Sequence, residues 1–390
     1  TNRGLADVLS IGRQARKELY NLQPEKPPPL IPPELCLEVD SRLSADGKPL
    51  ATLDEAGLRQ LCRQVEALAP RAVAINLLFS FIDDTEEKRI ESALQQFGTD
   101  ALFVSRSSDV LPEYREYERG ITTTLNAYVG PLMQRYLRRL EQKIPGCRLA
   151  VMQSSGGTAS AHHAGRYAVQ LLLSGPAGGL KGAQFSAAKS GFDRLLSFDM
   201  GGTSTDVSII DQEIGFTTEG HIGDYPVAAP MVDMHTIGAG GGSIASVDAG
   251  GLLLVGPESA GADPGPACYG KGGSRPTVTD ANVVLGRLLP DAFLGGRMVL
   301  DKAKSEQAVA TIADKLGMGL HEAATGIIDI VNDHMVRALR VMSVQRGEDP
   351  KDYTLISFGG AGGLHVCALA DALQMTRALA VSYTHLRAHE

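Results

Sequence analysis

Apolar positions along the first half of the chain follow two different spacings. They recur every three or four residues over 53–68 and 85–97, which predicts helices, whereas 72–81 is a continuous apolar run typical of a buried strand. Shorter strand patterns occupy 101–105 and 149–153. Strands and helices that alternate in this way indicate an α/β layered fold.

Two further helical patterns cover 5–19 and 121–144, and the second contains Pro131. Proline has no main-chain N–H to donate, so Pro131 is expected to break or kink that helix. Prolines also crowd the segment 24–33, where they favour extended backbone. The N-terminal part is therefore expected to be a short helix followed by an extended connector.

The second half of the chain is punctuated by glycine and proline. A helix is predicted over 174–189, with Pro176 in its first turn, and another from Ala281, with Thr279 or Asp280 as its cap. A later helix carries one apolar stripe at alternating steps of three and four residues: Ile328, Val331, Met335, Ala338 and Met342. That helix is expected to end near Gly347.

A hairpin with a glycine-rich tip lies at the centre of the sequence, over 195–210. Its first arm alternates Leu196 and Phe198 with a serine, and its second arm alternates apolar residues with a serine in the same way. The tip reads Gly-Gly-Thr-Ser-Thr and is bracketed by Asp199 and Asp206. Glycines let a phosphate approach main-chain N–H groups closely, and the hydroxyls add donors.

The two carboxylates of this hairpin would repel a phosphate unless a hard cation lies between them. Mg²⁺ takes one or two carboxylates together with waters and phosphate oxygens, which suits this arrangement. The loop contains no lysine and no helix follows it, so it is not a Walker A loop. The pattern therefore predicts a hairpin that binds the phosphates of a Mg-nucleotide. An ordinary tight hairpin with a polar tip remains the alternative.

Two other glycine-rich segments follow the hairpin. The segment 238–242 is followed by a predicted hairpin over 244–255, not by a helix, so it is not a dinucleotide-binding loop. It either approaches a ligand or is a packing turn. Asp233 and His235 precede it on one strand and could bind metal or substrate, although a structural role is commoner. The segment 359–363 follows a predicted strand and opens a helix, so its N–H groups could face an anion.

Composition narrows the class of protein. The 390 residues suffice for two or three domains, and 43% hydrophobic with 21% charged residues is ordinary for a globular chain. A net charge of −8 argues against nucleic acid or an anionic membrane as partner, and no apolar run approaches membrane-span length. Five scattered cysteines without a C-x-x-C pair favour reduced thiols and a cytoplasmic location.

Six motifs occur in an order that resembles the hydantoinase A/5-oxoprolinase family of the actin-like ATPase superfamily. They occupy residues 152–157, 173–178, 197–206, 235–243, 261–270 and 358–362. The resemblance implies an α/β, two-lobed actin-like (ribonuclease H-like) fold that is incomplete at both ends. Residues 1–190 would be the rest of the N-terminal lobe and 191–380 the ATPase lobe. Residues 381–390 fit neither the apolar pattern nor the family and are expected to be a non-native tail.

The resemblance also implies an activity: ATP-dependent phosphorylation and opening of a cyclic amide such as 5-oxoproline, a hydantoin or another lactam. Phosphoryl transfer depends on positioning and charge neutralisation. Asp199 would hold Mg²⁺ through water and Asp206 would orient water or the loop, both in catalytic roles. The residues implied to bind ATP come from all three glycine segments: Gly201, Gly202, Thr203, Ser204, Gly240, Gly241, Gly359, Gly360 and Gly362.

The partner implied by the family is a hydantoinase B-type second subunit. Nothing before Leu195 matches the first phosphate loop of the superfamily, so the chain as given is expected to be inactive in catalysis. Two other functions therefore stay open. One is a non-catalytic fragment or partner-binding scaffold subunit, and the other is a subunit of an ATP-dependent ketone carboxylase.

Overall fold

The computed structural model describes residues 1–13, 20–23, 29–97 and 102–380. The chain forms two compact units, the first made of Thr1–Ser174 with Phe216–Met231 and the second of Gly175–Gly215 with the residues from Val232 onward. The sequence placed the boundary near Gly191. Helix α7, Ser174–Lys189, instead lies with the second unit, because its buried Leu180 packs in one cluster with Leu195 and Ile210.

The first unit has its own apolar core beside a two-stranded parallel sheet. Strands β3 (Ala72–Ile75) and β4 (Phe103–Arg106) pair in parallel, and α2 (Glu55–Leu68) and α3 (Thr85–Phe97) contribute to the same core cluster. Its remaining helices and strands are α1 Val8–Ile11, β1 Arg42–Leu43, β2 Pro49–Ala51, α4 Ser107–Val110, α5 Glu116–Lys143, β5 Ala150–Met152, β6 Thr158–Ser160, α6 Ala161–Arg166, β10 Phe216–Thr217, β11 Gly220–Ile222 and β12 Tyr225–Val227.

Two predictions for this unit were wrong in extent. The apolar run 72–81 is a strand only as far as Ile75, because the N–H of Leu77 is bound by the buried Glu87 carboxylate and Phe79 has a positive φ of 61°. The long helix α5 begins before the predicted Ile121 and continues through Pro131. The predicted helix 5–19, connector 24–33 and strand 101–105 lie partly outside the described residues, and the tail 381–390 lies wholly outside them.

A six-stranded sheet organises the second unit. Its order is β14-β8-β7-β17-β18, with β9 paired to β8; β7 lies antiparallel to β8 and parallel to β17. Strand alternation sends Leu195 and Ile210 to the face covered by α7, while Phe198 and Met200 face α10. The bounds of its strands are β7 Arg194–Met200, β8 Thr205–Asp211, β9 Glu213–Ile214, β14 His235–Ile237, β17 Thr354–Phe358 and β18 Ala378–Ala380.

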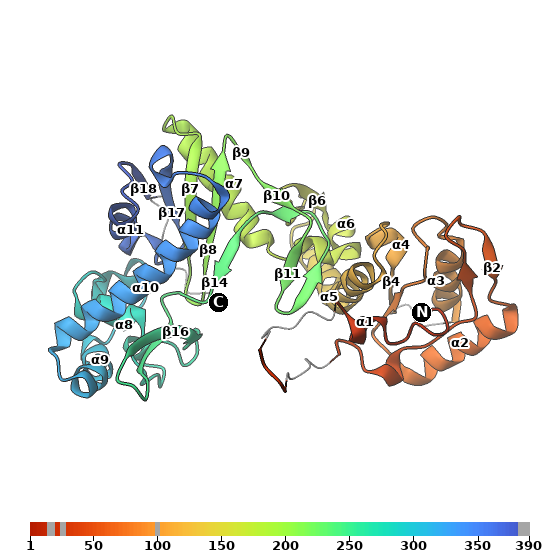
Figure 1. Ribbon diagram of the computed structural model, residues 1–390, viewed down its shortest axis with the longest axis horizontal. Helices are drawn as coiled ribbons and strands as arrows, with labels where there is room; N and C mark the ends of the chain where they lie inside the picture. The colour runs from red at the N-terminus through yellow and green to blue at the C-terminus, as the bar shows by residue number, and fades with distance from the viewer. Residues whose placement is uncertain (14–19, 24–28, 98–101, 381–390) are drawn as a thin grey trace. The chain divides into compact units, whose positions relative to one another are not determined.

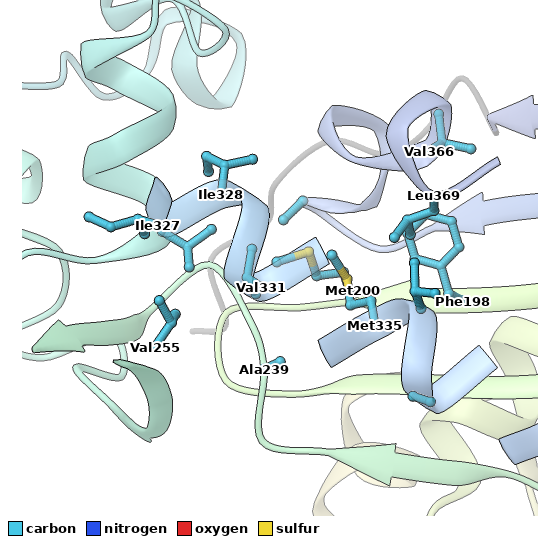
Figure 2. Close-up of a cluster of buried hydrophobic side chains, with 14 of the residues drawn as sticks. Phe198, Met200, Ala239, Val255, Ile327, Ile328, Val331, Met335, Val366 and Leu369 are labelled. Atoms are coloured by element: carbon cyan, nitrogen blue, oxygen red, sulfur yellow. The ribbon is translucent and has the colours of Figure 1, made fainter. Parts of the chain in front are cut away.

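The long helix α10, Leu320–Met342, covers this sheet with the apolar stripe predicted for it (Figure 1). Val331 and Met335 of α10 lie against Met200, and Val366 and Leu369 of α11 complete the cluster (Figure 2). The other elements of the second unit are β15 Ser243–Val247, β16 Leu253–Ser259, α8 Val278–Val284, α9 Lys302–Leu316 and α11 Val366–Ala372. Of the two residues of β13, Met231–Val232, the first belongs to the first unit and the second to the second unit.

The start of α8 corrects the predicted cap. Thr277 is the N-cap, and its hydroxyl accepts from the N–H of Asp280 at 3.2 Å. The hydroxyl of Thr279 is used elsewhere, donating to the carbonyl of Gly241 at 2.8 Å. Over the described residues, no helix combines the length and the apolar character that a membrane crossing requires.

Candidate functional site

The predicted hairpin is formed by β7 and β8, closed by a bond from the N–H of Gly201 to the carbonyl of Ser204 at 3.0 Å. Asp199 lies directly opposite Asp206 in the register. Residues opposite each other across two strands project to the same side of a sheet, so both carboxylates share one face. On the other face their neighbours Phe198 and Val207 are fully buried in the core.

The segment 238–242 packs against the main chain of the hairpin tip. The N–H of Gly241 donates to the carbonyl of Gly201 at 3.0 Å, and that of Gly242 to the carbonyl of Gly202 at 2.6 Å. A Cβ on Gly240 would lie 2.7 Å from the main-chain nitrogen of Thr203, which no real side chain tolerates. Of the two roles that the sequence allowed for the segment 238–242, ligand contact or a packing turn, these contacts are those of a packing turn. Direct ligand contact by Gly240 and Gly241 stays a prediction.

This packing determines where the donors of the tip point. In a planar trans peptide the carbonyl and the following N–H point in opposite directions. Because the carbonyls of Gly201 and Gly202 point at the segment 238–242, the N–H groups of Gly202 and Thr203 point away from it. Both residues are exposed, and no hydrogen bond between described residues uses these two N–H groups. The tip thus presents two unused main-chain donors, the arrangement that binds anions.

The third glycine segment lies beside Asp199. Phe358 at the end of β17 is the register partner of Asp199, and the N–H of Ala361 donates to the carbonyl of Met200 at 3.0 Å. A Cβ on Gly359, whose φ is +83°, would lie 2.0 Å from Oδ1 of Asp199. Glycine is therefore required there for the carboxylate to keep its position.

Gly359 and Gly360 are partly exposed, whereas Gly362 is buried. A Cβ on Gly362 would lie 2.4 Å from the hydroxyl oxygen of Ser357, beneath the loop. The structure thus brings the predicted residues of the hairpin and of the loop 359–363 together. Gly362 lies on the inner side of that loop.

Asp206 lies in an environment that disfavours its charge. Burial raises the pKa of its carboxyl, and the hydroxyl of Thr236, which donates to Oδ1 at 2.5 Å, acts in the opposite direction. A carboxylate with a raised pKa is a better proton acceptor near neutral pH than an exposed one. Thr205 anchors the same strand by donating to the carbonyl of Ala239 at 2.5 Å.

Among the described residues, no group of three or more histidine, cysteine, aspartate or glutamate side chains could hold a metal ion. The predicted Mg²⁺ needs fewer protein ligands, because phosphate oxygens and waters complete its shell. The partly exposed Asp199 lies near the end of β7, next to the tip, and fits that requirement. In the second candidate pair, Asp233 and His235, the carboxylate of Asp233 is bound to the guanidinium of Arg346, 3.1 Å from Nη2 to Oδ1.

Three threonines make contacts that the sequence did not predict: it counted Thr205 among the hydroxyl donors of the tip, named Thr279 as a possible helix cap and did not single out Thr236. Thr205, Thr236 and Thr279 each bind a group of the hairpin or of the segment that supports it. Their partners lie 30 to 38 residues away along the chain, so no local spacing signals them. Only the pairing of β14 with β8 brings Thr236 opposite Asp206.

Comparisons with known proteins match almost the whole chain. A family model described as Hydantoinase/oxoprolinase covers residues 119–388, and one described as Hydantoinase/oxoprolinase N-terminal region covers 1–98. The chain is 38% identical to caprolactamase subunit alpha of Pseudomonas jessenii over 378 residues, which is 95% of this chain and 54% of that protein.

Two solved structures resemble the whole described architecture. The crystal structure of ATP-dependent caprolactamase from Pseudomonas jessenii matches with a TM-score of 0.80 and 35% identity, over 99% of this chain and 57% of that one. The nucleotide-free structure of acetone carboxylase matches with a TM-score of 0.80 and 29% identity, over 97% and 55%. The chain thus spans little more than half the length of these relatives.

Proposed function

Since the chain belongs to the hydantoinase/oxoprolinase family, we propose that it is the nucleotide-binding part of an enzyme that opens a cyclic amide at the expense of ATP. The fold is the α/β fold of actin-like ATPases predicted from the sequence, which the two solved relatives confirm. The substrate that we propose is 5-oxoproline, a hydantoin or another lactam.

One observation carries the proposal: the N–H groups of Gly202 and Thr203, which no described residue binds, lie at the tip of a hairpin whose two aspartates face the same side. Bound Mg-ATP would supply the phosphoryl group that activates an amide carbonyl. The tip residues would bind its phosphates, and Asp199 would hold the ion through water. Asp206, with its raised pKa, would orient or deprotonate a water. Gly359 and Gly360 would line the nucleotide.

A second subunit would complete the active site. The relative in Pseudomonas jessenii is a subunit by its name, which supports a hydantoinase B-type partner for this chain. An ATP-dependent ketone carboxylase subunit is the second candidate, because acetone carboxylase matches with the same TM-score as caprolactamase. The higher identity to caprolactamase, 35% against 29%, is the reason why we propose the cyclic amide first.

The first test is binding of Mg-ATP to the full chain by isothermal titration calorimetry. Asp199→Asn is expected to weaken binding at least tenfold, since it removes the charge that attracts the ion, a loss of about 1.4 kcal/mol or more. Asp211→Asn is the matched control. It changes the exposed end of the partner strand β8, where the carboxylate pairs with Arg194 at 3.2 Å, and should leave the affinity unchanged.

Activity is then measured as release of ADP by the chain together with a hydantoinase B-type subunit. ADP release that depends on a lactam, with the ring-opened amino acid as product, supports the proposal. Release that depends on a ketone and bicarbonate supports the carboxylase instead. No binding of Mg-ATP to the unchanged chain, or equal binding by the Asp199 variant, contradicts the nucleotide-binding role and favours a scaffold subunit.

A further inference from the structure

His365 is a fully buried histidine at the end of the third glycine segment, between Gly362–Leu364 and α11. Its Nδ1 lies 2.7 Å from Oδ1 of Asn332 on α10. Around this bond α10 and α11 meet through apolar side chains, among them Met335 and Leu369 (Figure 2). The bond is thus a polar link within a hydrophobic interface.

The chemistry of this link selects one form of the imidazole. A carbonyl oxygen can only accept, so Nδ1 carries the proton and donates to Asn332. The ring is neutral, because burial, assisted by the positive charge of Arg287, lowers the pKa of His365 to about 4. Nε2 is then an unprotonated acceptor, and no described residue donates to it.

A buried acceptor without a donor is unfavourable. A leucine would fill similar space without that penalty, so packing alone does not account for an imidazole at this position. What leucine lacks is the directed bond to Asn332. The bond itself is therefore the feature that explains the residue.

The bond fixes the far end of the loop whose near end touches the candidate site. At the near end Gly359 packs on Asp199, and Ala361 donates to Met200 of β7. At the far end the N–H of His365 donates to the carbonyl of Gly362 at 3.0 Å, while its side chain binds α10. The loop is therefore held between the sheet and α10 by bonds at both ends.

We propose that His365 is a positioning residue for nucleotide binding, which acts through Asn332 to hold the loop 359–363 in place beside Asp199. The inference rests on the proposed function and assigns this role to a residue that does not itself touch the ligand. It distinguishes the two nitrogens of the ring: the bond of Nδ1 is required, and Nε2 is not.

Two amide substitutions separate the two nitrogens. In His365→Asn the amide nitrogen takes the place of Nδ1, whereas in His365→Gln it takes the place of Nε2. The affinity for Mg-ATP is expected to stay within about threefold of the unchanged chain for the Asn variant and to fall five- to tenfold for the Gln variant, the size of one lost hydrogen bond. Asn332→Leu should weaken binding to a similar degree, and His365→Gln combined with Asn332→Leu should be no weaker than the worse single variant.

A second measurement does not depend on nucleotide. NMR of the unchanged chain with ¹⁵N-labelled histidines should show one imidazole that stays neutral at pH 6 with its proton on Nδ1. His365→Asn should abolish that signal. A proton on Nε2, or an affinity lost with Asn and kept with Gln, overturns the proposal. If the unchanged chain binds no Mg-ATP while this signal is present, the proposed function fails. Hydrogen exchange of the amides of 359–363 then decides the positioning role, which requires faster exchange in the Gln variant than in the Asn variant.

Discussion

Asp280 is a fully buried carboxylate that accepts five hydrogen bonds, and replacing it by asparagine should destabilise the second unit severely. Its donors are the main-chain N–H groups of Ala267, Cys268 and Thr277 at 3.1, 2.9 and 3.1 Å and the hydroxyls of Thr277 and Ser305 at 2.8 and 2.7 Å. Asparagine keeps the shape but replaces one oxygen by an NH₂ group, which cannot accept.

The smaller loss occurs when the NH₂ group takes the place of Oδ1. The N–H of Cys268 then faces another donor, whereas the hydroxyl of Ser305 can turn to accept. One unsatisfied buried donor costs about 1–3 kcal/mol, and each of the three remaining bonds weakens by roughly 1 kcal/mol when its acceptor loses its charge. Relief from burying a charge returns part of this, so we expect a net loss of about 3 kcal/mol.

The assay is urea unfolding followed by circular dichroism, with hydrogen exchange of 278–284 to identify the unit that unfolds. Asp301→Asn is the control, because Asp301 caps α9 at the surface and asparagine caps as well as aspartate. The reasoning is refuted if Asp280→Asn lowers the free energy of unfolding no more than Asp301→Asn does.

Three further predictions concern the glycine packing, the buried histidine and the core. Gly240→Ala should abolish Mg-ATP binding, because the new Cβ would meet the main chain of Thr203. The control Gly182→Ala, on an open face of α7, should leave the stability unchanged or raise it by up to about 1 kcal/mol. Equal effects of the two variants on Mg-ATP binding and on thermal unfolding would contradict the packing role of Gly240. His365 has a pKa of about 4 in the folded protein and 6.5 in the unfolded chain, so as the pH falls the unfolded state binds the proton first. The free energy of unfolding should therefore decrease by up to roughly 3 kcal/mol between pH 6.5 and pH 4. In urea unfolding, His365→Asn should lack this part of the pH dependence. Met335→Ala should lower the free energy of unfolding by about 2–5 kcal/mol, since Met335 is fully buried among α10, β7 and α11, and a loss below about 1 kcal/mol would show that the core refills the space.

The sequence predicted best those features that neighbouring residues determine. Helices α3 and α7 have the predicted bounds, and the two hairpins β7–β8 and β15–β16 lie where alternation and glycine turns placed them. In each case the signal is local: apolar spacing within the element and a turn-forming residue at its end.

Features that depend on distant partners were not predictable in the same way. The strand β3 ends early because the buried Glu87, ten residues further along the chain, reaches back to bind the N–H of Leu77. For the candidate site, the glycines of the tip followed from the motif. The role of Gly240 depends on its contact with Thr203, 37 residues earlier, and the bond of His365 to Asn332 likewise joins residues that only the fold brings together.

The polypeptide passes between its two compact units three times, after residues 174, 215 and 231. The returning stretch 216–231 supplies Val227 and Met231 to the cluster that contains Ile121 and Leu125 of α5. A gene cut after residue 174 would therefore yield an N-terminal product that lacks Val227 and Met231, so the remaining apolar side chains of this cluster would be exposed to water. Neither unit is encoded by one uninterrupted stretch of DNA, so we expect recombination within this family to exchange the two units together.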